Sequence, residues 1–377
     1  MRGGTSKGLF FHERDLPGDR NEQDVLILAA FGSPDAFRRQ IDGIGGAVST
    51  TSKVAVIGDG TPYGVDVTYE FGQVGIDQPL VDRRGNCGNI SSAVGPFAVD
   101  EGLVKVTEPV TQVRILNLNT NKVIVAHVPI RNGKFDPIGD FELPGVPGAG
   151  ARLRMDYLDP GGAVTGRLLP TGNVRDSISV PELGDIEISM VDAANPVVFI
   201  RWETLGLTGQ ESVAEVDSDT ALLVRLESVR AAASVLAGIA PDMESAASVA
   251  PSIPKLAIVG EPRSYTASNG AAIAPTSANL RAGMMSMGRM HNSYPLTGAI
   301  ATTVASRIPG TLVHGSATAT EGDFLIAHQA GVLPMSAEVE AAAEGFIVKR
   351  VSGYRTARRL MEGNVLIAED RVQVSVS

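Results

Sequence analysis

The stretch "GNCGNISSAVGPFA" at residues 85–98 decides the fold, because a turn rich in Gly and Asn leads directly into a helix of small residues. The stretch "YPLTGAIATTVASRI" at 294–308 has the same plan. Each stretch comes after a short apolar strand candidate, "KVAVIG" at 53–58 and "KLAIVG" at 255–260, and each is followed by further strand candidates. This recurrence predicts two related α+β halves that meet at a cleft.

The other candidate elements fit a first half at 1–176 and a second half at 177–377. Runs rich in Val and Ile, bounded by Gly, Asn or Pro, predict strands at 65–76, 111–130 (a hairpin turning at 119–121), 185–202, 323–340 and 345–368. Helical spacing of apolar residues predicts helices at 22–31, 88–99, 217–239, 276–290 and 297–307. A single larger mixed domain is the alternative.

Composition narrows the class of protein. The 377 residues carry a net charge of -10, which argues against a dedicated nucleic-acid surface. No stretch approaches the roughly 20 apolar residues of a membrane span, and the N-terminus lacks the features of a signal peptide. A single cysteine excludes an internal disulfide and a cysteine-rich zinc site, so a reducing cytoplasm is the simplest compartment.

The chain begins with "RGGTSKG" at 2–8, which is glycine-rich and loop-like. We expect that the numbered chain starts a few residues inside the domain, because a strand should precede such a loop. The stretch lacks the phosphate-loop pattern. Its consecutive N–H groups around Gly4, Thr5 and Ser6 are nevertheless a candidate anion nest.

The only cysteine, Cys87, is the first candidate for chemistry. At the start of a predicted helix its thiol would lie near unpaired N–H groups and the positive end of the helix dipole, which favours the thiolate. The flanking residues Asn86, Gly88 and Asn89 leave room for a ligand to approach the backbone. The alternative is a buried cysteine that packs as a small apolar residue.

Lys53 is the second candidate. It follows four hydroxyl residues, among them Ser49 and Thr50, and opens an apolar strand. Burial of a lysine lowers its pKa toward the range useful to a general acid or base. An exposed lysine at a strand end is the alternative.

Weaker candidates lie farther along the chain. "LPTGNVRD" at 169–176 is a turn-like anion candidate that contains Thr171, Gly172 and Asn173. Asn195 precedes a proline at a strand entry, which is also explained by turn chemistry. The five histidines are dispersed without metal-ligand spacing, although His291 lies near a predicted cleft segment.

Six stretches together, in the same order over nearly the whole chain, strongly resemble the 2-methylaconitate cis–trans isomerase (PrpF) family, whose relatives include methylitaconate isomerases and oxalomesaconate tautomerases. They are "MRGGTSKG", "IDGIGGAVSTTSK", "FGQVGID", "GNCGN", "LPTGN" and "GYRTARRLMEG". The resemblance implies a diaminopimelate-epimerase-like fold, in which each of two pseudo-symmetric halves wraps strands around a central helix and the active site lies between the halves.

The resemblance also implies roles for residues. The family's catalytic lysine and cysteine correspond to Lys53 and Cys87. Epimerases of this fold use a second cysteine, and its counterpart here, "YPLTGA", has none, so the lysine would supply the other acid or base. The likeness of "NP" at 195–196 to the epimerases supports Asn195 as a ligand contact, whereas "HQAG" at 328–331 departs from the family's usual "HPSG".

These features favour a cofactor-independent isomerase of an unsaturated di- or tricarboxylate such as 2-methylaconitate. N–H groups at the two helix starts, near Cys87 and near Thr297 and Gly298, would stabilise the enolate-like intermediate without a metal. Either Lys53 or Cys87 could be the base. A methylitaconate isomerase, an oxalomesaconate tautomerase, an amino-acid racemase, a non-catalytic carboxylate-binding protein and a cysteine hydrolase are the alternatives. The oligomeric state, a homodimer included, stays open.

Overall fold

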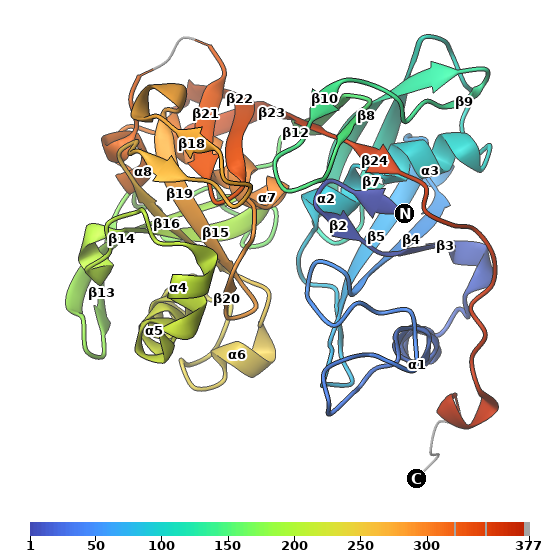
Figure 1. Ribbon diagram of the computed structural model, residues 1–377, viewed down its shortest axis with the longest axis horizontal. Helices are drawn as coiled ribbons and strands as arrows, with labels where there is room; N and C mark the ends of the chain where they lie inside the picture. The colour runs from blue at the N-terminus through green and yellow to red at the C-terminus, as the bar shows by residue number, and fades with distance from the viewer. Residues whose placement is uncertain (320–321, 344, 373–377) are drawn as a thin grey trace. The chain divides into compact units, whose positions relative to one another are not determined.

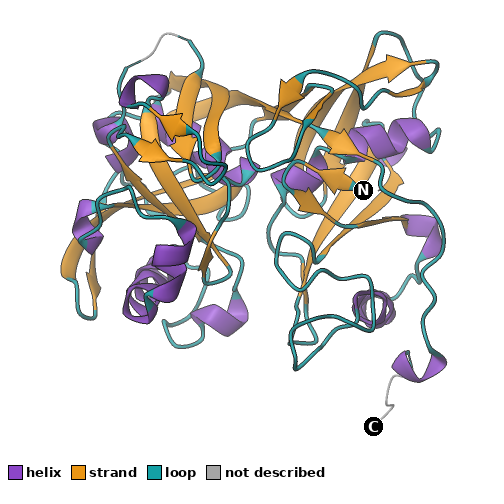
Figure 2. Cartoon of the chain, viewed as in Figure 1, coloured by secondary structure: helices purple, strands orange, loops and turns teal. Residues whose placement is uncertain are grey.

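The computed structural model describes residues 1–319, 322–343 and 345–372. The chain divides into two compact units, and both are built mainly from strands (Figures 1 and 2). Unit 1 comprises Met1–Phe141, Gly148–Arg154 and the C-terminal residues from Arg355, and unit 2 comprises Glu142–Pro147 and Met155–Tyr354. Within the described residues, no helix is both long and apolar enough to cross a membrane.

Unit 1 contains helices α1 (Arg20–Phe31), α2 (Gly88–Ser91) and α3 (Val94–Asp100). Its strands are β1 (Arg2–Gly3), β2 (Ser6–Lys7), β3 (Leu9–His12), β4 (Lys53–Asp59), β5 (Val67–Val74), β6 (Val81–Asp82), β7 (Val110–Asn117), β8 (Lys122–Arg131), β9 (Lys134–Phe135), β11 (Ala149–Gly150) and β24 (Ala357–Arg358). The chain enters unit 2 within β10 (Phe141–Glu142), returns to unit 1 after Pro147, enters unit 2 again within β12 (Leu153–Leu158), and returns to unit 1 at the end of β23 (Phe346–Arg355).

Unit 2 contains helices α4 (Val213–Ser218), α5 (Thr220–Leu236), α6 (Ala246–Val249), α7 (Leu296–Ser306) and α8 (Leu312–Ser316). Its strands are β13 (Asp176–Val180), β14 (Gly184–Ala193), β15 (Asn195–Arg201), β16 (Lys255–Gly260), β17 (Tyr265–Thr266), β18 (Ala272–Ile273), β19 (Leu280–Ser286), β20 (Arg289–Met290), β21 (Phe324–His328) and β22 (Gly331–Ala341). Residue 176, where the sequence predicts the break between halves, opens β13 inside this unit.

The two units repeat one pattern of strand pairing. In unit 1, β3 pairs parallel with β4, β4 antiparallel with β5, β5 parallel with β7, and β7 antiparallel with β8. In unit 2, the order β15, β16, β19, β21, β22 shows the same sequence of parallel and antiparallel pairings. A parallel pairing needs a crossover, and α3 and α7 occupy equivalent crossovers. The half-repeat predicted from "KVAVIG" and "KLAIVG" is therefore present in the topology.

Helix α7 is the buried centre of unit 2. Its residues from Leu296 to Ala305 are all buried, and it packs against β14, β15 and β22. A helix that is apolar around its whole circumference is stable only when strands cover every side. In unit 1 the shorter α3 packs in the same way against β7, β8 and β9.

The predicted helix at 276–290 is wrong, because these residues form β19 and β20. The run "LRAGMMS" is continuously apolar apart from Arg281, and periodicity alone cannot separate such a run from a buried helix. Pairing of β19 with β16 and β21 on its two edges decides in favour of a strand.

Other predicted elements are interrupted. The helix expected at 88–99 divides into α2 and α3. The helix expected at 217–239 also divides in two: α4 begins before residue 217, and α5 begins after Asp219, whose side chain caps it. The run at 185–202 is a hairpin in which Ala194 alone, at φ 63°, separates β14 from β15. The run at 323–340 is likewise a hairpin, β21 and β22. The predicted hairpin at 111–130 is confirmed as β7 and β8.

A packed cluster around α5 makes a prediction about stability. Leu226 on α5 is 2% exposed and belongs to the same core cluster as Trp202, the only tryptophan of the chain, whereas Val224 on the same helix is 56% exposed. Leu226→Ala should lower the free energy of unfolding by about 2–5 kcal/mol, because it leaves a cavity. Val224→Ala should change it by no more than about 0.5 kcal/mol. Urea unfolding followed by Trp202 fluorescence measures both, and equal losses would contradict this packing.

Candidate active site

Lys53 opens β4 in the interior of unit 1. In register it pairs with Gln73 on β5, and its Nζ donates a hydrogen bond of 2.5 Å to Gln73 Oε1. The residue is only 8% exposed, and Nζ lies 5.1 Å from the centroid of the Phe71 ring. The alternative of an exposed lysine at a strand end therefore does not apply.

Burial changes the acid–base behaviour of this amine. Loss of hydration lowers the pKa of Lys53 from its ordinary value of 10.5, and the Cys87 side chain opposes this shift, because a thiolate at this place would attract the ammonium and accept a hydrogen bond from it. Lys53 and Cys87, 34 positions apart in the sequence, are thus interacting neighbours within one unit. A lysine with a lowered pKa is a stronger candidate for a general base at neutral pH than an exposed one.

Cys87 is the N-cap residue of α2, with an extended backbone (φ −117°, ψ 99°) and a partly exposed side chain. The four residues of α2 form a single turn, so the dipole acting on the thiol is smaller than that of the twelve-residue helix predicted at 88–99. The neighbours Asn86, Gly88 and Asn89 are buried. Cys87 is therefore more exposed than these three neighbours.

Asn89, two residues after Cys87, has a side chain that contacts two segments far apart in the sequence. Its Nδ2 donates to Thr5 Oγ1 at 3.0 Å, and its Oδ1 accepts a hydrogen bond of 3.0 Å from Nε of Arg355. Gly4, at φ +52°, lies so close that a Cβ there would be 2.3 Å from Asn89 Oδ1. The glycine of "RGGTSKG" is thus required by the close approach to Asn89, and Arg355 adds a buried cation to the site.

The remaining residues predicted for unit 1 lie on the same network. The backbone oxygen of Thr50 accepts from the N–H of Lys7 at 2.9 Å, next to the buried Ser6, and the backbone oxygen of Ser49 accepts from Gln73 Nε2 at 3.2 Å. Hydrogen bonds and strand pairings therefore bring together three segments that are far apart in sequence: residues 4–6, 49–53 and 86–89.

The candidates of the second half all lie in unit 2. Asn195 begins β15 and is buried. Thr297 and Gly298 are buried in the first turn of α7, where a Cβ at Gly298 would lie 2.5 Å from Met284. His291 is buried, and its Nδ1 accepts the backbone N–H of Ser293 at 3.0 Å, which leaves the proton of a neutral ring on Nε2.

The "LPTGN" stretch forms a turn closed by its own polar side chains. Thr171 Oγ1 donates to one carboxylate oxygen of Asp176, and Asn173 Nδ2 donates to the other. Gly172 is exposed at φ +84°, which suits a turn. This geometry supplies a structural reason for the motif, and it connects the turn to no other predicted site residue.

Two residues of the site, Gln73 and Arg355, were not among the predicted residues. Both lie in stretches that carried the family resemblance, "FGQVGID" and "GYRTARRLMEG". A neutral amide and one arginine of several have no distinctive spacing, so strand register and long-range contact are needed to place them beside Lys53 and Asn89.

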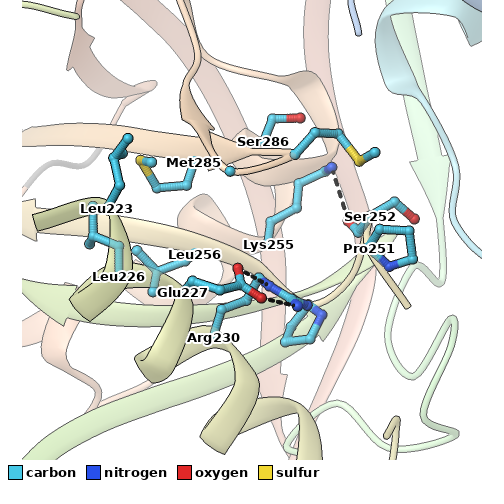
Figure 3. A pocket seen from close by; sticks show the side chains of 13 residues that line it. Leu223, Leu226, Glu227, Arg230, Pro251, Ser252, Lys255, Leu256, Met285 and Ser286 are labelled. Atoms are coloured by element: carbon cyan, nitrogen blue, oxygen red, sulfur yellow. Dashed lines mark hydrogen bonds and ion pairs between the residues drawn. The ribbon is translucent and has the colours of Figure 1, made fainter. Parts of the chain in front are cut away.

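A hollow in unit 2, between α5 and β16, contains none of the predicted residues (Figure 3). Its charged groups are engaged with neighbouring protein atoms. Arg230 donates to both carboxylate oxygens of Glu227 at 2.5 and 2.8 Å and to two backbone carbonyls, and Lys255 Nζ lies 3.4 Å from the carbonyl oxygen of Ser252. Across the described residues, no cluster of three or more His, Cys, Asp or Glu side chains could hold a metal ion.

Comparison with known proteins identifies the family of this chain. A family model described as "PrpF protein" matches residues 1–368. The 3-methylitaconate isomerase of Eubacterium barkeri is 42% identical over 99% of this chain and 97% of its own length. The 2-methyl-aconitate isomerase of Shewanella oneidensis is 40% identical over 97% of this chain and 95% of its own length. The 4-oxalomesaconate tautomerase of Pseudomonas putida is 38% identical over 98% of this chain and 95% of its own length.

Solved structures confirm the predicted fold. A methylitaconate-delta-isomerase crystal structure matches with a TM-score of 0.81 at 41% identity, over 100% of this chain and 96% of that one. A hydroxyproline epimerase from Agrobacterium vitis matches with a TM-score of 0.51 at 13% identity, over 91% and 84%. At that identity the second match concerns the fold alone, and it confirms the epimerase-like architecture.

Burial of Lys53 predicts a pH dependence of stability. Because the pKa of Lys53 is lowered in the folded protein, the unfolded chain binds more protons between that pKa and 10.5. The free energy of unfolding should therefore rise with pH across this interval, by about 1.4 kcal/mol for each unit of lowering. Lys53→Met should lose this rise, whereas the same change at the exposed Lys105 should keep it.

Urea unfolding of the three proteins between about pH 7 and about pH 10 measures this dependence. Parallel curves for wild type and Lys53→Met would mean that the amine is as well solvated in the folded protein as in the unfolded chain.

Proposed function

The chain belongs to the PrpF family and is an isomerase, and we propose that it moves a proton within an unsaturated di- or tricarboxylate such as 2-methylaconitate, with Lys53 and Cys87 as its acid–base pair. The observation that carries the proposal is the interaction of a buried lysine of lowered pKa with the only thiol of the chain. The names of relatives that share 38–42% of its residues support the substrate class.

The proposed reaction begins with removal of a proton from a carbon atom of the substrate. A proton that is α to a carboxylate and allylic to a double bond is weakly acidic, so its removal needs a base at a fixed position and groups that stabilise the resulting dienolate. We assign the base to Lys53, because burial lowers the pKa of its amine and so favours the neutral form. Cys87 then returns a proton from its thiol, which leaves a lysine ammonium and a thiolate.

The site of proton return decides the product. Return to the original carbon after rotation in the delocalised intermediate gives cis–trans exchange, and return to the far allylic carbon gives a shift of the double bond. Because the side chains of Lys53 and Cys87 interact, a proton can pass from the ammonium to the thiolate and restore the starting state. The sequence of steps consumes no proton overall and needs no redox partner.

Substrate carboxylates are assigned to groups around Cys87. Asn89, held by Thr5 and by Arg355, offers a polar surface next to the thiol, and the Arg355 guanidinium is the nearby buried cation. Asn86 and the first N–H groups of α2 complete this set. Since the proposed chemistry requires a free thiol, we also propose a reducing compartment, the cytoplasm, as the place of action.

Two relatives point to neighbouring reactions as the second candidate. The relatives are named for methylitaconate isomerisation and oxalomesaconate tautomerisation. In the proposed mechanism both reactions would begin with the same proton abstraction and would differ in where the proton returns. A racemase is disfavoured because the second half contributes no cysteine, and a non-catalytic carboxylate-binding protein would have no use for the lowered pKa of Lys53.

Proton exchange tests the proposed function directly. In D2O, the wild-type protein should introduce deuterium into one of 2-methylaconitate, methylitaconate or oxalomesaconate, followed by NMR. Lys53→Ala and Cys87→Ser should each lower the exchange rate by at least about 10²-fold, because each removes one of the two proton carriers.

Lys255→Ala is the matched control, because Lys255 opens β16, the strand of unit 2 that corresponds to β4. Its exchange rate should stay within about twofold of wild type, as expected for a change outside the site. Absence of exchange with all three acids would sink the proposed function.

A further inference from the structure

Gln73 has no assigned role, yet it is the residue that holds the Lys53 amine. It is 6% exposed on β5, and its Oε1 accepts the 2.5 Å hydrogen bond from Lys53 Nζ. We propose that Gln73 is a positioning residue that fixes the Lys53 amine for proton transfer. This inference rests on the proposed function for its catalytic meaning, and its structural part can be tested without turnover.

The orientation of the Gln73 amide is determined by its other contacts. Nε2 donates to the backbone oxygen of Ser49 at 3.2 Å and to that of Ser52 at 2.9 Å. A flipped amide would set its oxygen against these two carbonyl oxygens and its N–H groups against the lysine amine. Oε1 must therefore face Lys53, and the amine receives an acceptor whose direction is set by the backbone.

The segment that orients Gln73 is itself fixed. Ser52 Oγ donates to Gln40 Oε1 at 2.7 Å, and the same oxygen accepts the N–H of Ala47 at 2.8 Å. Gln40 Nε2 donates to Ser33 Oγ at 2.9 Å, and both Gln40 and Ser52 are at most 1% exposed. A chain of buried hydrogen bonds thus runs from the body of unit 1 to the lysine, so the position of Nζ does not depend on solvent.

A neutral amide suits this task better than a carboxylate. It accepts a hydrogen bond from the ammonium and from the neutral amine alike, so it holds Nζ in both protonation states without adding a negative charge. A carboxylate in its place would favour the charged form and oppose the effect of burial. With one N–H of the neutral amine given to Gln73, the lone pair points away from Gln73.

The charged groups near the Lys53 amine also affect its pKa. Cys87 is the titratable group that interacts with it. Asp82 of β6, which pairs in register with Gln73, accepts hydrogen bonds from the backbone N–H and Nε of Arg84 on its Oδ1. A substitution at Gln73 should therefore change the position and the pKa of the Lys53 amine more directly than it changes the Asp82 carboxylate.

Two substitutions separate positioning from a purely structural role. Gln73→Met and Gln73→Glu both lose the donors to Ser49 and Ser52, but only Gln73→Glu keeps an oxygen for Lys53. Gln73→Met should lower kcat by about 10²-fold, since a displaced base costs that much, with KM within about twofold. Gln73→Glu should keep more activity, and its pH–rate profile should move to higher pH, whereas that of Gln73→Met should move to lower pH.

An NMR titration of the Lys53 side chain supplies a readout without substrate. In protein labelled at lysine and assigned with Lys53→Ala, the pKa of Lys53 should rise in Gln73→Glu and fall in Gln73→Met. The same two changes at Gln112, which is exposed on β7, are the controls and should leave the titration unchanged.

Equal losses of activity in both Gln73 variants, with the pH profile and the Lys53 titration unmoved, would overturn the inference and leave Gln73 a structural residue. If the wild type exchanges no proton with any of the three acids, the proposed function fails, and the Lys53 titrations still decide whether Gln73 holds the amine.

Discussion

The burial of one amine between β4 and β5 is the constraint on which the site depends. An unpaired ammonium removed from water costs far more than a hydrogen bond returns, so the group must find partners or lose its proton. Lys53 does so with an uncharged acceptor, Gln73, and a titratable neighbour, Cys87. The same loss of hydration that makes the position costly lowers the pKa of the amine and favours its basic form, so stability and the proposed reactivity are opposed at this residue.

The topological repeat supplies the scaffold for this site, and the proposed chemistry depends on a few residues that differ between the two units. β4 and β16 begin with lysines at equivalent places and have the same pairing pattern. Only the first lysine meets a thiol, because the turn before α2 contains Cys87 and the turn before α7 contains Pro295. A scaffold with a topological repeat can thus hold an asymmetric pair of side chains, which we propose as the two proton carriers.

The sequence predicted the architecture and singled out Lys53 and Cys87, which the structure brings together. It missed the residues whose place at the site depends on strand register and long-range contact. Small-residue helices after glycine-rich turns, and long strands rich in Val and Ile, have local signals, so the half-repeat and most of the longer strands were predicted. The strand at Leu280–Ser286 was not, because a continuous apolar run has no period that separates strand from helix. Gln73 and Arg355 reach the site only through pairing across strands and contact over 266 positions, for which a single sequence has no signal.

The contacts of Arg355 and its neighbours have a consequence for synthesis on the ribosome. The N–H of Gly4 donates to the carbonyl oxygen of Thr356, and the side chain of Arg2 donates to the same residue, so unit 1 incorporates both early and late parts of the polypeptide. Unit 2 lies almost wholly between these two parts in the sequence, so all of it is translated before the last segment of unit 1. A nascent chain that stalls before residue 355 lacks the cation next to Asn89, so vectorial translation delays assembly of the proposed reactive centre until that residue has been added.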